Sequence, residues 1–188
     1  NYASRKQTSS TPRGVMYDAN GKIIANTIQS MNITYYPNED VSNDEEWELA
    51  IQFTKQFGKS KYEPTDDEWK KLYLILSVDS SGKKDQGNHL LTKNELQQAL
   101  KGEISSEKAD KLKMKRIKQA DIDDLPQDYR EAYPTWLLMQ SVSENESKTI
   151  LSNVSDEQVS YLSEHQNEFR GFEVTSGWKR EYPYDKTL

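Results

Sequence analysis

The sequence predicts an α+β fold in which a small sheet built from both ends of the chain carries a helical insertion between them. The strongest hairpin pattern lies within the first 40 residues, helix-start patterns recur after residue 42, and a strand–helix–strand pattern fills the last third. Hydrophobic residues make up 34% of the 188 residues and charged residues 30%, which is lean for one round core and favours an elongated chain of several lobes. The 11 Tyr, 4 Trp and 4 Phe can anchor several small cores.

The N-terminal segment predicts a hairpin after a polar lead-in at residues 1–12. Short strands at 15–17 and 22–26 flank the turn Asp18-Ala19-Asn20-Gly21, because Asn-Gly tolerates the positive φ angles of a tight turn. A third strand at 30–36 is indicated by the alternation of apolar and polar residues. These strands form the first half of the expected sheet.

Beyond residue 41 the pattern changes to helices that start at capping boxes. A polar loop at 79–88 separates the second helix from the third, and a charged helical stretch covers about 105–120. The segment 121–140 is expected to be a loop followed by a helix that carries Trp136. The capping boxes that open helices begin at Ser42, Thr65, Thr92 and Ser155.

The last third returns to the sheet, with a short strand at 149–151, a helix from Ser155 that Gly171 ends, and a strand from Phe172 onwards. The expected subdomains are therefore a β/α part formed by 13–40 and 147–188, and a helical insertion at 41–146. The four tryptophans, at positions 47, 69, 136 and 178, are expected to pack in cores.

Charge and composition exclude several function classes. A net charge of −6 argues against nucleic acid and anionic lipid as partners of the whole chain. The absence of cysteine excludes disulfides, thiolate metal sites and cysteine nucleophiles. The sequence has no apolar run long enough for a membrane span, and its abrupt start is compatible with an upstream anchor.

Two motifs near opposite ends resemble signatures of one family. Arg13-Gly14, followed by Asp18, Asn20 and Gly21, resembles the first signature of the non-catalytic N-terminal module of class B penicillin-binding proteins. The family usually has arginine where Ala19 stands. Arg180, Tyr182 and Pro183 resemble the second signature, which usually continues into glycine where this chain has Asp185. The segment 156–174 is similar to the helix and strand that precede this signature, and the turn, insertion and C-terminal segment look most similar to 2B-type proteins of Gram-positive bacteria.

This resemblance implies a pedestal, or dimerisation, region without its own chemistry and without a cofactor. The full-length protein would carry an N-terminal membrane anchor on the extracytoplasmic face of the bacterial membrane. Its C-terminal transpeptidase domain, absent here, would cross-link peptidoglycan and bind penicillin. The implied partners are that domain, a RodA-type glycosyltransferase and other cell-wall synthesis proteins. Physically, Gly14 permits close backbone approach, and the planar fork of Arg13 suits carboxylates or carbonyls. We therefore expect the two chain ends to meet at a junction with the missing domain.

Catalytic and metal patterns in the chain are weak. Ser-x-x-Lys occurs from Ser80, Ser81, Ser105 and Ser176, and Ser143-Glu144-Asn145 matches a second transpeptidase triplet. The Ser-x-x-Lys matches lie in polar segments. The triplet lies too close to Lys148-Thr149-Ile150 for these two elements to form separate walls of a cleft. No catalytic residue is therefore assigned. His89 and His165 are far apart, and each is expected to be a surface residue without a paired acid at metal-ligand spacing. The EF-hand-like loop from Asp79 lacks its last ligand, so no metal site is assigned either.

Two alternatives remain open at this point. The basic block 108–118 could contact an anionic polymer, although a solvated helix face is the simpler interpretation. The whole chain could also be a free-standing surface module that binds a polymer or a protein.

Overall fold

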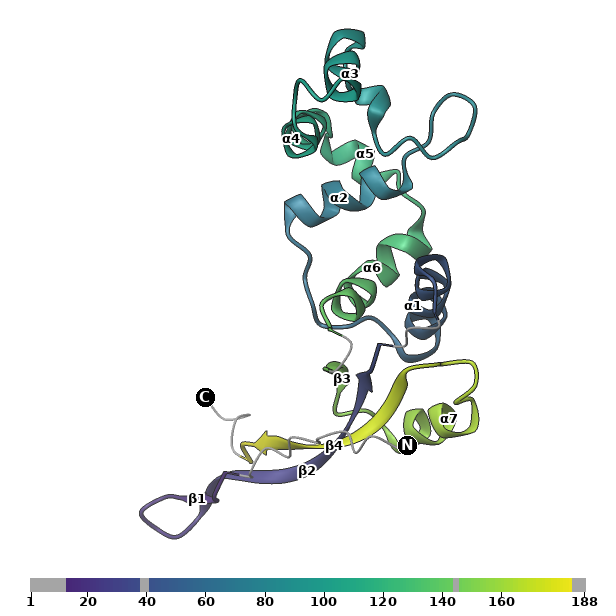
Figure 1. The fold of residues 1–188 in the computed structure, drawn as a ribbon. Coiled ribbons are helices and arrows are strands. Elements are labelled where there is room, and N and C mark those ends of the chain that lie inside the picture. The colour runs from purple at the N-terminus through teal and green to yellow at the C-terminus, as the bar shows by residue number, and fades with distance from the viewer. Residues whose placement is uncertain (1–12, 38–40, 144–145, 184–188) are drawn as a thin grey trace. The chain divides into compact units, whose positions relative to one another are not determined.

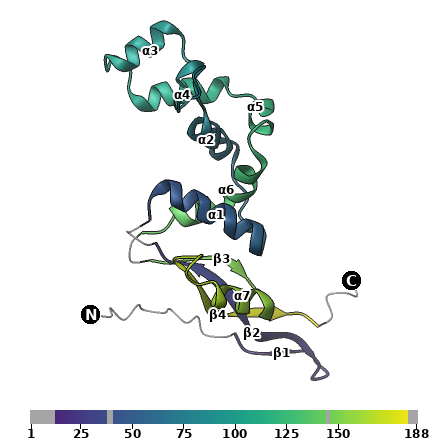
Figure 2. The ribbon, with the colours of Figure 1, turned by 90° about the vertical axis from the view of Figure 1, so that its right-hand side faces the viewer.

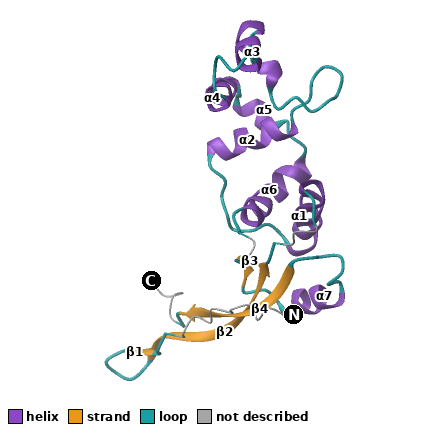
Figure 3. Ribbon diagram, viewed as in Figure 1, coloured by secondary structure: helices purple, strands orange, loops and turns teal. Residues whose placement is uncertain are grey.

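The computed structural model describes residues 13–37, 41–143 and 146–183 of the chain. It has the predicted α+β class, with helices and a small antiparallel sheet (Figure 1; Figure 3). Its chain contacts divide it into two compact units. One unit comprises Asn1–Ser60 with Thr135–Leu188, and the other comprises Lys61–Pro134. Each has its own core.

The sheet of the first unit is organised around one long strand. Strand β2 (Ile23–Tyr35) pairs with β4 (Phe172–Glu181) along one side, while β1 (Met16–Tyr17) and β3 (Lys148–Ser152) pair with it at its two ends (Figure 2). All pairings are antiparallel. The predicted strands at 22–26 and 30–36 are thus one strand, because β4 pairs continuously with residues 26–35 and no breaker interrupts them.

Aromatic packing forms the core of this unit. Helix α1 (Asn43–Phe57) places Phe53 against Phe172 of β4, with stacked rings 4.2 Å apart between centroids. Helix α7 (Asp156–Glu164) precedes Phe169, which meets Phe57 edge to face at 5.2 Å. The large buried side chains of this unit are Ile33, Tyr35, Phe53, Met139, Leu162 and Phe172.

The helical insertion expected at 41–146 does not coincide with the second compact unit. Helix α1 and the last turns of α6 (Gln127–Gln140) belong to the unit that contains the sheet. Trp47 of α1 stacks on Trp136 of α6, with ring centroids 4.3 Å apart. Both helices thus bury apolar faces in the core beside the sheet. The change of periodicity at residue 41 shows where the helices begin, but it does not show which core they join.

The second unit, Lys61–Pro134, is helical. It contains α2 (Asp66–Leu76), a 3₁₀ turn at Asn88–Leu90, α3 (Lys93–Leu100), α4 (Ser106–Arg116), α5 (Gln119–Asp123) and the start of α6. The stretch expected to be one helix at 105–120 breaks at Ile117, whose backbone is extended while its side chain is buried. Residues 119–123, partly expected as loop, form α5. Buried Leu72, Ala109, Ile122 and Tyr133 form this unit's core.

Local signals explain where the helices begin. The four predicted capping boxes are confirmed, since Ser42, Thr65, Thr92 and Ser155 each exchange hydrogen bonds with the residue three positions later. Helix α6 instead runs through Pro134, which lacks the N–H that would bond to the carbonyl four residues earlier. This proline lies at the boundary between the two units.

Candidate functional site

The two predicted motifs meet at one end of the sheet. The guanidinium of Arg180, on β4, donates from Nη1 to the carbonyl of Gly14 at 2.7 Å and to Thr27 Oγ1 at 3.1 Å. Thr27 lies opposite Arg180 in the ladder, and its hydroxyl donates to the carbonyl of Arg13 at 2.8 Å. Gly14 and Arg180, which are 166 positions apart in the sequence, are thereby joined, and both motifs are held to β2. We call Arg13, Gly14, Thr27 and Arg180 the motif cluster.

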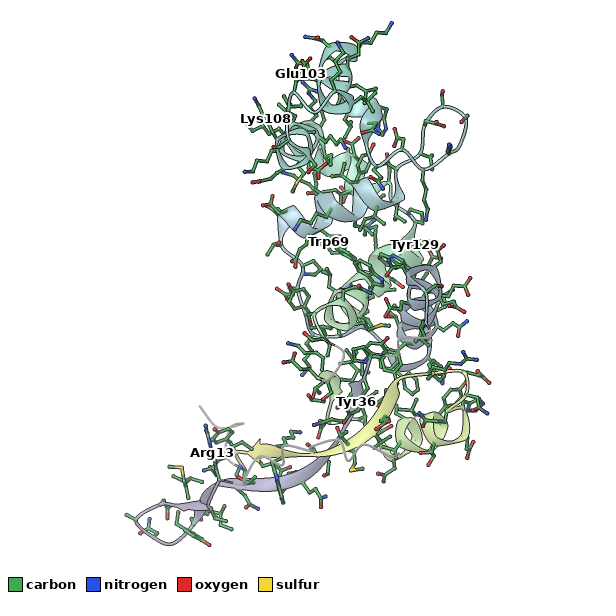
Figure 4. All side chains as sticks on the ribbon, in the orientation of Figure 1. Arg13, Tyr36, Trp69, Glu103, Lys108 and Tyr129 are labelled. Atoms are coloured by element: carbon green, nitrogen blue, oxygen red, sulfur yellow. The ribbon has the colours of Figure 1, made fainter. Side chains whose placement is uncertain are left out.

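Within this cluster, Arg180 has the role that the sequence suggested for Arg13. A guanidinium that holds a carbonyl is present, but it belongs to Arg180, and both of its hydrogen bonds leave from Nη1. The side chain of Arg13 is exposed at the hairpin end of β2 (Figure 4), and no described residue accepts a hydrogen bond from its guanidinium. Tyr36, just beyond the other end of β2, donates its N–H to Gly171. Arg13 thus contributes its backbone carbonyl, and not its guanidinium, to the hydrogen bonds among the described residues at the motif end of the sheet.

Asp18, Asn20 and Gly21 build the turn that carries the hairpin. The Asp18 carboxylate accepts the N–H groups of Asn20 and Lys22 at 2.8 and 2.7 Å, and the Asp18 carbonyl accepts the Gly21 N–H at 3.1 Å. Among the residues of this turn only Gly21 has a positive φ, of 76°. Asn20 tolerates positive φ but does not use it here, whereas Gly21 does. The hairpin loop comprises the five residues between Tyr17 and Ile23, with Gly21 in the left-handed position.

Large apolar side chains are exposed around the motif cluster. Trp178 lies opposite Gln29, two residues before Arg180, and is 45% exposed, so its predicted core packing is wrong. Its position near the end of the sheet places it beyond the aromatic core. Tyr182 and Pro183 follow β4 and are also exposed. The exposed apolar residues of this end are Val15, Met16, Tyr17, Ile23, Ile24, Trp178 and Tyr182.

The serines of the Ser-x-x-Lys matches serve local structure. Ser81 Oγ donates to Asp79 at 2.6 Å inside a turn, and Ser105 caps α4 by accepting the Lys108 N–H at 3.2 Å. Ser176 lies within β4. Glu144 and Asn145 of the Ser143 triplet lie outside the described residues.

His89 differs from the expectation that it lacks a paired acid. Its Nδ1 lies 2.8 Å from Asp85 Oδ2, and its Nε2 lies 3.2 Å from the Tyr73 hydroxyl. The Asp85 carboxylate also accepts the backbone N–H groups of Gly87 and His89, so it orders the loop before α3. These hydrogen bonds, together with the histidine, hold the pKa of Asp85 below its usual value, although burial opposes them. This arrangement is the network of an ordered loop. In the described ranges, no three acidic or histidine side chains cluster as metal ligands would.

The basic block at 108–118 is mostly exposed, and three of its residues form contacts within the second unit. Lys113 is buried and donates to the Gln86 carbonyl at 3.1 Å. Arg116 makes a forked pair with Glu95 at 2.7 and 2.9 Å and also donates to the Leu90 carbonyl. Lys111 pairs with Glu107 at 2.6 Å. Figure 4 shows Lys108 on the outer side of α4, and every basic side chain of the block except Lys113 is exposed, as expected for a solvated helix face.

Sequence reasoning missed two contributors to the site. Thr27 carries no signal in the sequence, because its role depends on lying opposite Arg180. The exposure of Trp178 likewise depends on where the core ends along β4. Within the described residues, no helix has the length and apolar character needed to cross a membrane.

Comparison with known proteins gives a consistent result. The family model described as the penicillin-binding protein dimerisation domain matches residues 8–188. Penicillin-binding protein 2A of Bacillus subtilis (strain 168) is 28% identical over 188 residues, covering 96% of this chain and 25% of that protein. The chain thus spans about a quarter of the length of this relative.

Two solved structures share the fold. Penicillin-binding protein 2B of Streptococcus pneumoniae strain 5204 matches with a TM-score of 0.60 at 16% identity, covering 93% of this chain and 26% of that one. The 2B protein of strain R6 matches with a TM-score of 0.53 at 17% identity, covering 92% and 25%. The predicted resemblance is confirmed: the chain belongs to the penicillin-binding protein dimerisation domain family, as the N-terminal region of a class B penicillin-binding protein.

Proposed function

We propose that this chain is the non-catalytic pedestal of a peptidoglycan D,D-transpeptidase, and that its motif cluster forms the junction with the catalytic domain. The observation that carries the proposal is the contact of Arg180 with Gly14 and Thr27. It fixes the outgoing strand β4 to the start of the hairpin. A domain that follows β4 would therefore leave from a rigid sheet end.

The surroundings of the cluster support a junction. The apolar side chains exposed there, among them Met16, Tyr17 and Trp178, would be covered by a neighbouring domain. The exposed Arg13 guanidinium can bind carboxylates or carbonyls of that domain through a planar fork. Residues Tyr182 and Pro183 begin the connection.

Penicillin labelling tests the non-catalytic assignment. We expect a fluorescent penicillin to label the longer protein read from the same gene and to leave this 188-residue chain unlabelled. In the longer protein the label would sit on the serine of a Ser-x-x-Lys motif outside this chain. Labelling of this chain itself, or of neither protein, would contradict the proposal.

The junction has its own test in the longer protein. Met16→Ser and Tyr17→Ser remove apolar area from the hairpin, so we expect the unfolding temperature of the transpeptidase domain to fall by several degrees. Leu100→Ser is the matched control, because Leu100 is 79% exposed in the second unit. Equal effects of hairpin and control substitutions would refute the junction.

The proposal extends to membrane and partners. The full-length protein would be anchored in the bacterial membrane, with the pedestal on its extracytoplasmic face. The helical unit Lys61–Pro134 would contact a RodA-type glycosyltransferase or other cell-wall synthesis proteins. Replacing this unit by a short linker should abolish co-purification with that partner, and unchanged co-purification would show that the unit is not the contact.

A second candidate function is a free-standing surface module that binds a polymer or a protein. The exposed apolar hairpin is compatible with such a ligand. A reading frame that ends near Leu188 would favour it, whereas a frame that continues into Ser-x-x-Lys and Lys-Thr-Gly motifs would exclude it.

A further inference from the structure

A cavity of about 240 Å³ lies at the surface of the first compact unit. Helix α1 forms one wall of this cavity, and the segment that connects α7 to β4 forms the other. The cavity is smaller than the clefts that bind drug-sized molecules, so it suits a ligand of about the size of one amino acid. The residues on its two walls show which chemical class of ligand it can hold.

The wall formed by α1 combines carboxylates with an apolar floor. Glu45, Glu48 and Gln52 follow one another at intervals of three and four residues, so their side chains project from one face of the helix. Leu49 lies one turn after Glu45, and its buried side chain gives the cavity an apolar part. The same helix is fixed to the core of the unit by the stacked ring of Phe53. This wall is therefore a firm support for two carboxylates.

The opposite wall carries a cation on a fixed backbone. Arg170 directly precedes Gly171, whose carbonyl accepts the Tyr36 N–H at 2.8 Å. Gly171 has a φ of 84°, and a Cβ at this position would lie 2.6 Å from the Tyr36 carbonyl oxygen, so the chain is held tightly here. Asn167 and Glu168 line the same wall beside Arg170. The cavity thus has a guanidinium on one side and carboxylates on both sides.

The carboxylate of Glu45 is held in its ionised form. Its Oε2 accepts the backbone N–H and the hydroxyl of Ser42 at 2.8 and 2.7 Å. The hydrogen bonds from Ser42, first of all the one from its backbone, lower the pKa of Glu45, and the charge of Arg170 lowers it further, although desolvation opposes them. The guanidinium of Arg170 is therefore close enough to act on Glu45 across the cavity.

We propose that this cavity binds a basic amino acid with a free α-carboxylate, such as lysine, either alone or at the carboxyl end of a peptide. Arg170 holds the α-carboxylate through its planar fork. The ammonium groups of the ligand lie against the carboxylates of Glu45, Glu48 and Glu168. The aliphatic part of the ligand covers Leu49, as the stems of long cationic side chains cover apolar surface elsewhere.

The charges on the two walls select this class of ligand. Three carboxylates and one guanidinium line the cavity, so negative charge is in excess. An acidic amino acid would add to this excess, whereas a basic amino acid reduces it and still offers a carboxylate to Arg170. Binding is weak, with a dissociation constant on the order of 1 mM, because solvent-exposed ion pairs contribute little. The inference does not depend on the proposed junction or on transpeptidase activity.

NMR titration of this 188-residue chain with lysine tests the inference. We expect saturable shifts of the backbone amide signals of Glu48, Gln52 and Arg170. Two ligands of nearly the same shape separate the charges, because lysinamide lacks the α-carboxylate and norleucine lacks the side-chain ammonium. Arg170→Gln should lower the affinity for lysine about fivefold without lowering the affinity for lysinamide. Glu48→Gln should weaken the binding of lysine more than the binding of norleucine.

The controls separate this site from diffuse attraction to an acidic chain. Glu103→Gln removes one exposed carboxylate from the second unit and should leave the affinity for lysine unchanged, and circular dichroism checks that each variant folds. Lysine that causes no saturable shift would overturn the inference. So would equal effects of Glu48→Gln and Glu103→Gln, or an Arg170→Gln variant that binds lysine as tightly as the parent chain.

A peptide distinguishes the two sources of the ligand. A tripeptide of two alanines and a carboxyl-terminal lysine keeps the α-carboxylate and the side-chain ammonium but has no α-ammonium on the lysine. If it causes the same shifts as lysine, the cavity takes the end of a peptide. If only lysine causes them, the cavity takes the free amino acid. Either result supports the site, and shifts with neither ligand would overturn it.

Discussion

Arg180 shows how one side chain can join distant parts of the sequence. It reaches both the carbonyl of Gly14 and the hydroxyl of Thr27, and Thr27 in turn holds Arg13. Both hydrogen bonds leave from Nη1, which carries two N–H groups and can therefore satisfy both acceptors at once. The hairpin start is thus anchored through a single guanidinium.

Arg180→Ala should loosen the hairpin. Loss of these charge-assisted hydrogen bonds is expected to cost about 1–2 kcal/mol locally. The amides of Met16 and Tyr17 should then exchange with solvent about tenfold faster in hydrogen-exchange measurements. Arg180→Lys keeps a charged nitrogen but lacks the planar guanidinium that positions it, so it should recover only part of the protection. Unchanged exchange in Arg180→Ala would show that the cluster does not hold the hairpin.

The hydrogen bonds of the Glu95 carboxylate predict that the stability of the second unit depends on pH. The forked pair with Arg116, followed by the hydrogen bonds from Thr92, lowers the pKa of Glu95 to about 2 from 4.5. Because the folded-state pKa is lowered, the stabilisation is fully present above pH 4.5 and is lost as the pH falls toward 2. The unfolding temperature of the parent chain should therefore fall as the pH is lowered through this window. The unfolding temperature of the Glu95→Gln variant should fall less steeply. Glu107→Gln, at the exposed Lys111 pair, is the control and should follow the parent curve.

At the scale of elements, the chain uses one turn twice. Asp79 in the second unit repeats the hydrogen bonds of Asp18, accepting Ser81 and Lys83 N–H groups at 2.8 and 3.0 Å. Gly82 has a φ of 81°, close to that of Gly21. Both turns have the sequence Asp-x-x-Gly-Lys. The carboxylate fixes the loop, and glycine permits the left-handed residue.

Gly82→Ala should destabilise its turn because of this φ angle and not because of crowding. No heavy atom lies within 4 Å of the position that a Cβ would take at Gly82 or at Gly21. The expected loss is about 1 kcal/mol in the unfolding free energy for each substitution to Ala. Denaturant unfolding measures it, and Gly82→Asn should lose less because asparagine tolerates this region. An equal loss of unfolding free energy in Gly82→Ala and Gly82→Asn would contradict this explanation.

At the scale of the whole molecule, the two compact units have separate cores. Phe53 is fully buried in the first unit, where it stacks on Phe172, and Leu72 is fully buried in the second. Stability is therefore distributed over two clusters instead of one central core. This agrees with the lean hydrophobic content of the sequence.

Phe53→Ala should destabilise the first unit by about 3–5 kcal/mol through the cavity it leaves. Amides in Lys61–Pro134 should keep most of their protection in hydrogen-exchange measurements. Leu72→Ala is the reciprocal change and should affect the second unit first. Equal loss of protection in both units after either substitution would show that they unfold as one.

Local signals in the sequence were sufficient for much of the fold. The capping boxes predicted four helix starts, and the strand at Phe172 was predicted from its composition and from Gly171. These features depend on neighbours a few residues away. The helix break at Ile117 and the passage of α6 through Pro134 were missed, because buried contacts override local preference there.

The sequence by itself determined the fold class, most element positions and, through two motifs, the family. The tertiary structure alone decided that β2 is one strand, that α1 belongs with the sheet, and that Arg180 and not Arg13 binds the Gly14 carbonyl. These properties depend on the register between β2 and β4, which joins residues 137 to 155 positions apart. Such pairings depend on packing between distant segments, whereas turns and caps are set by the residues beside them.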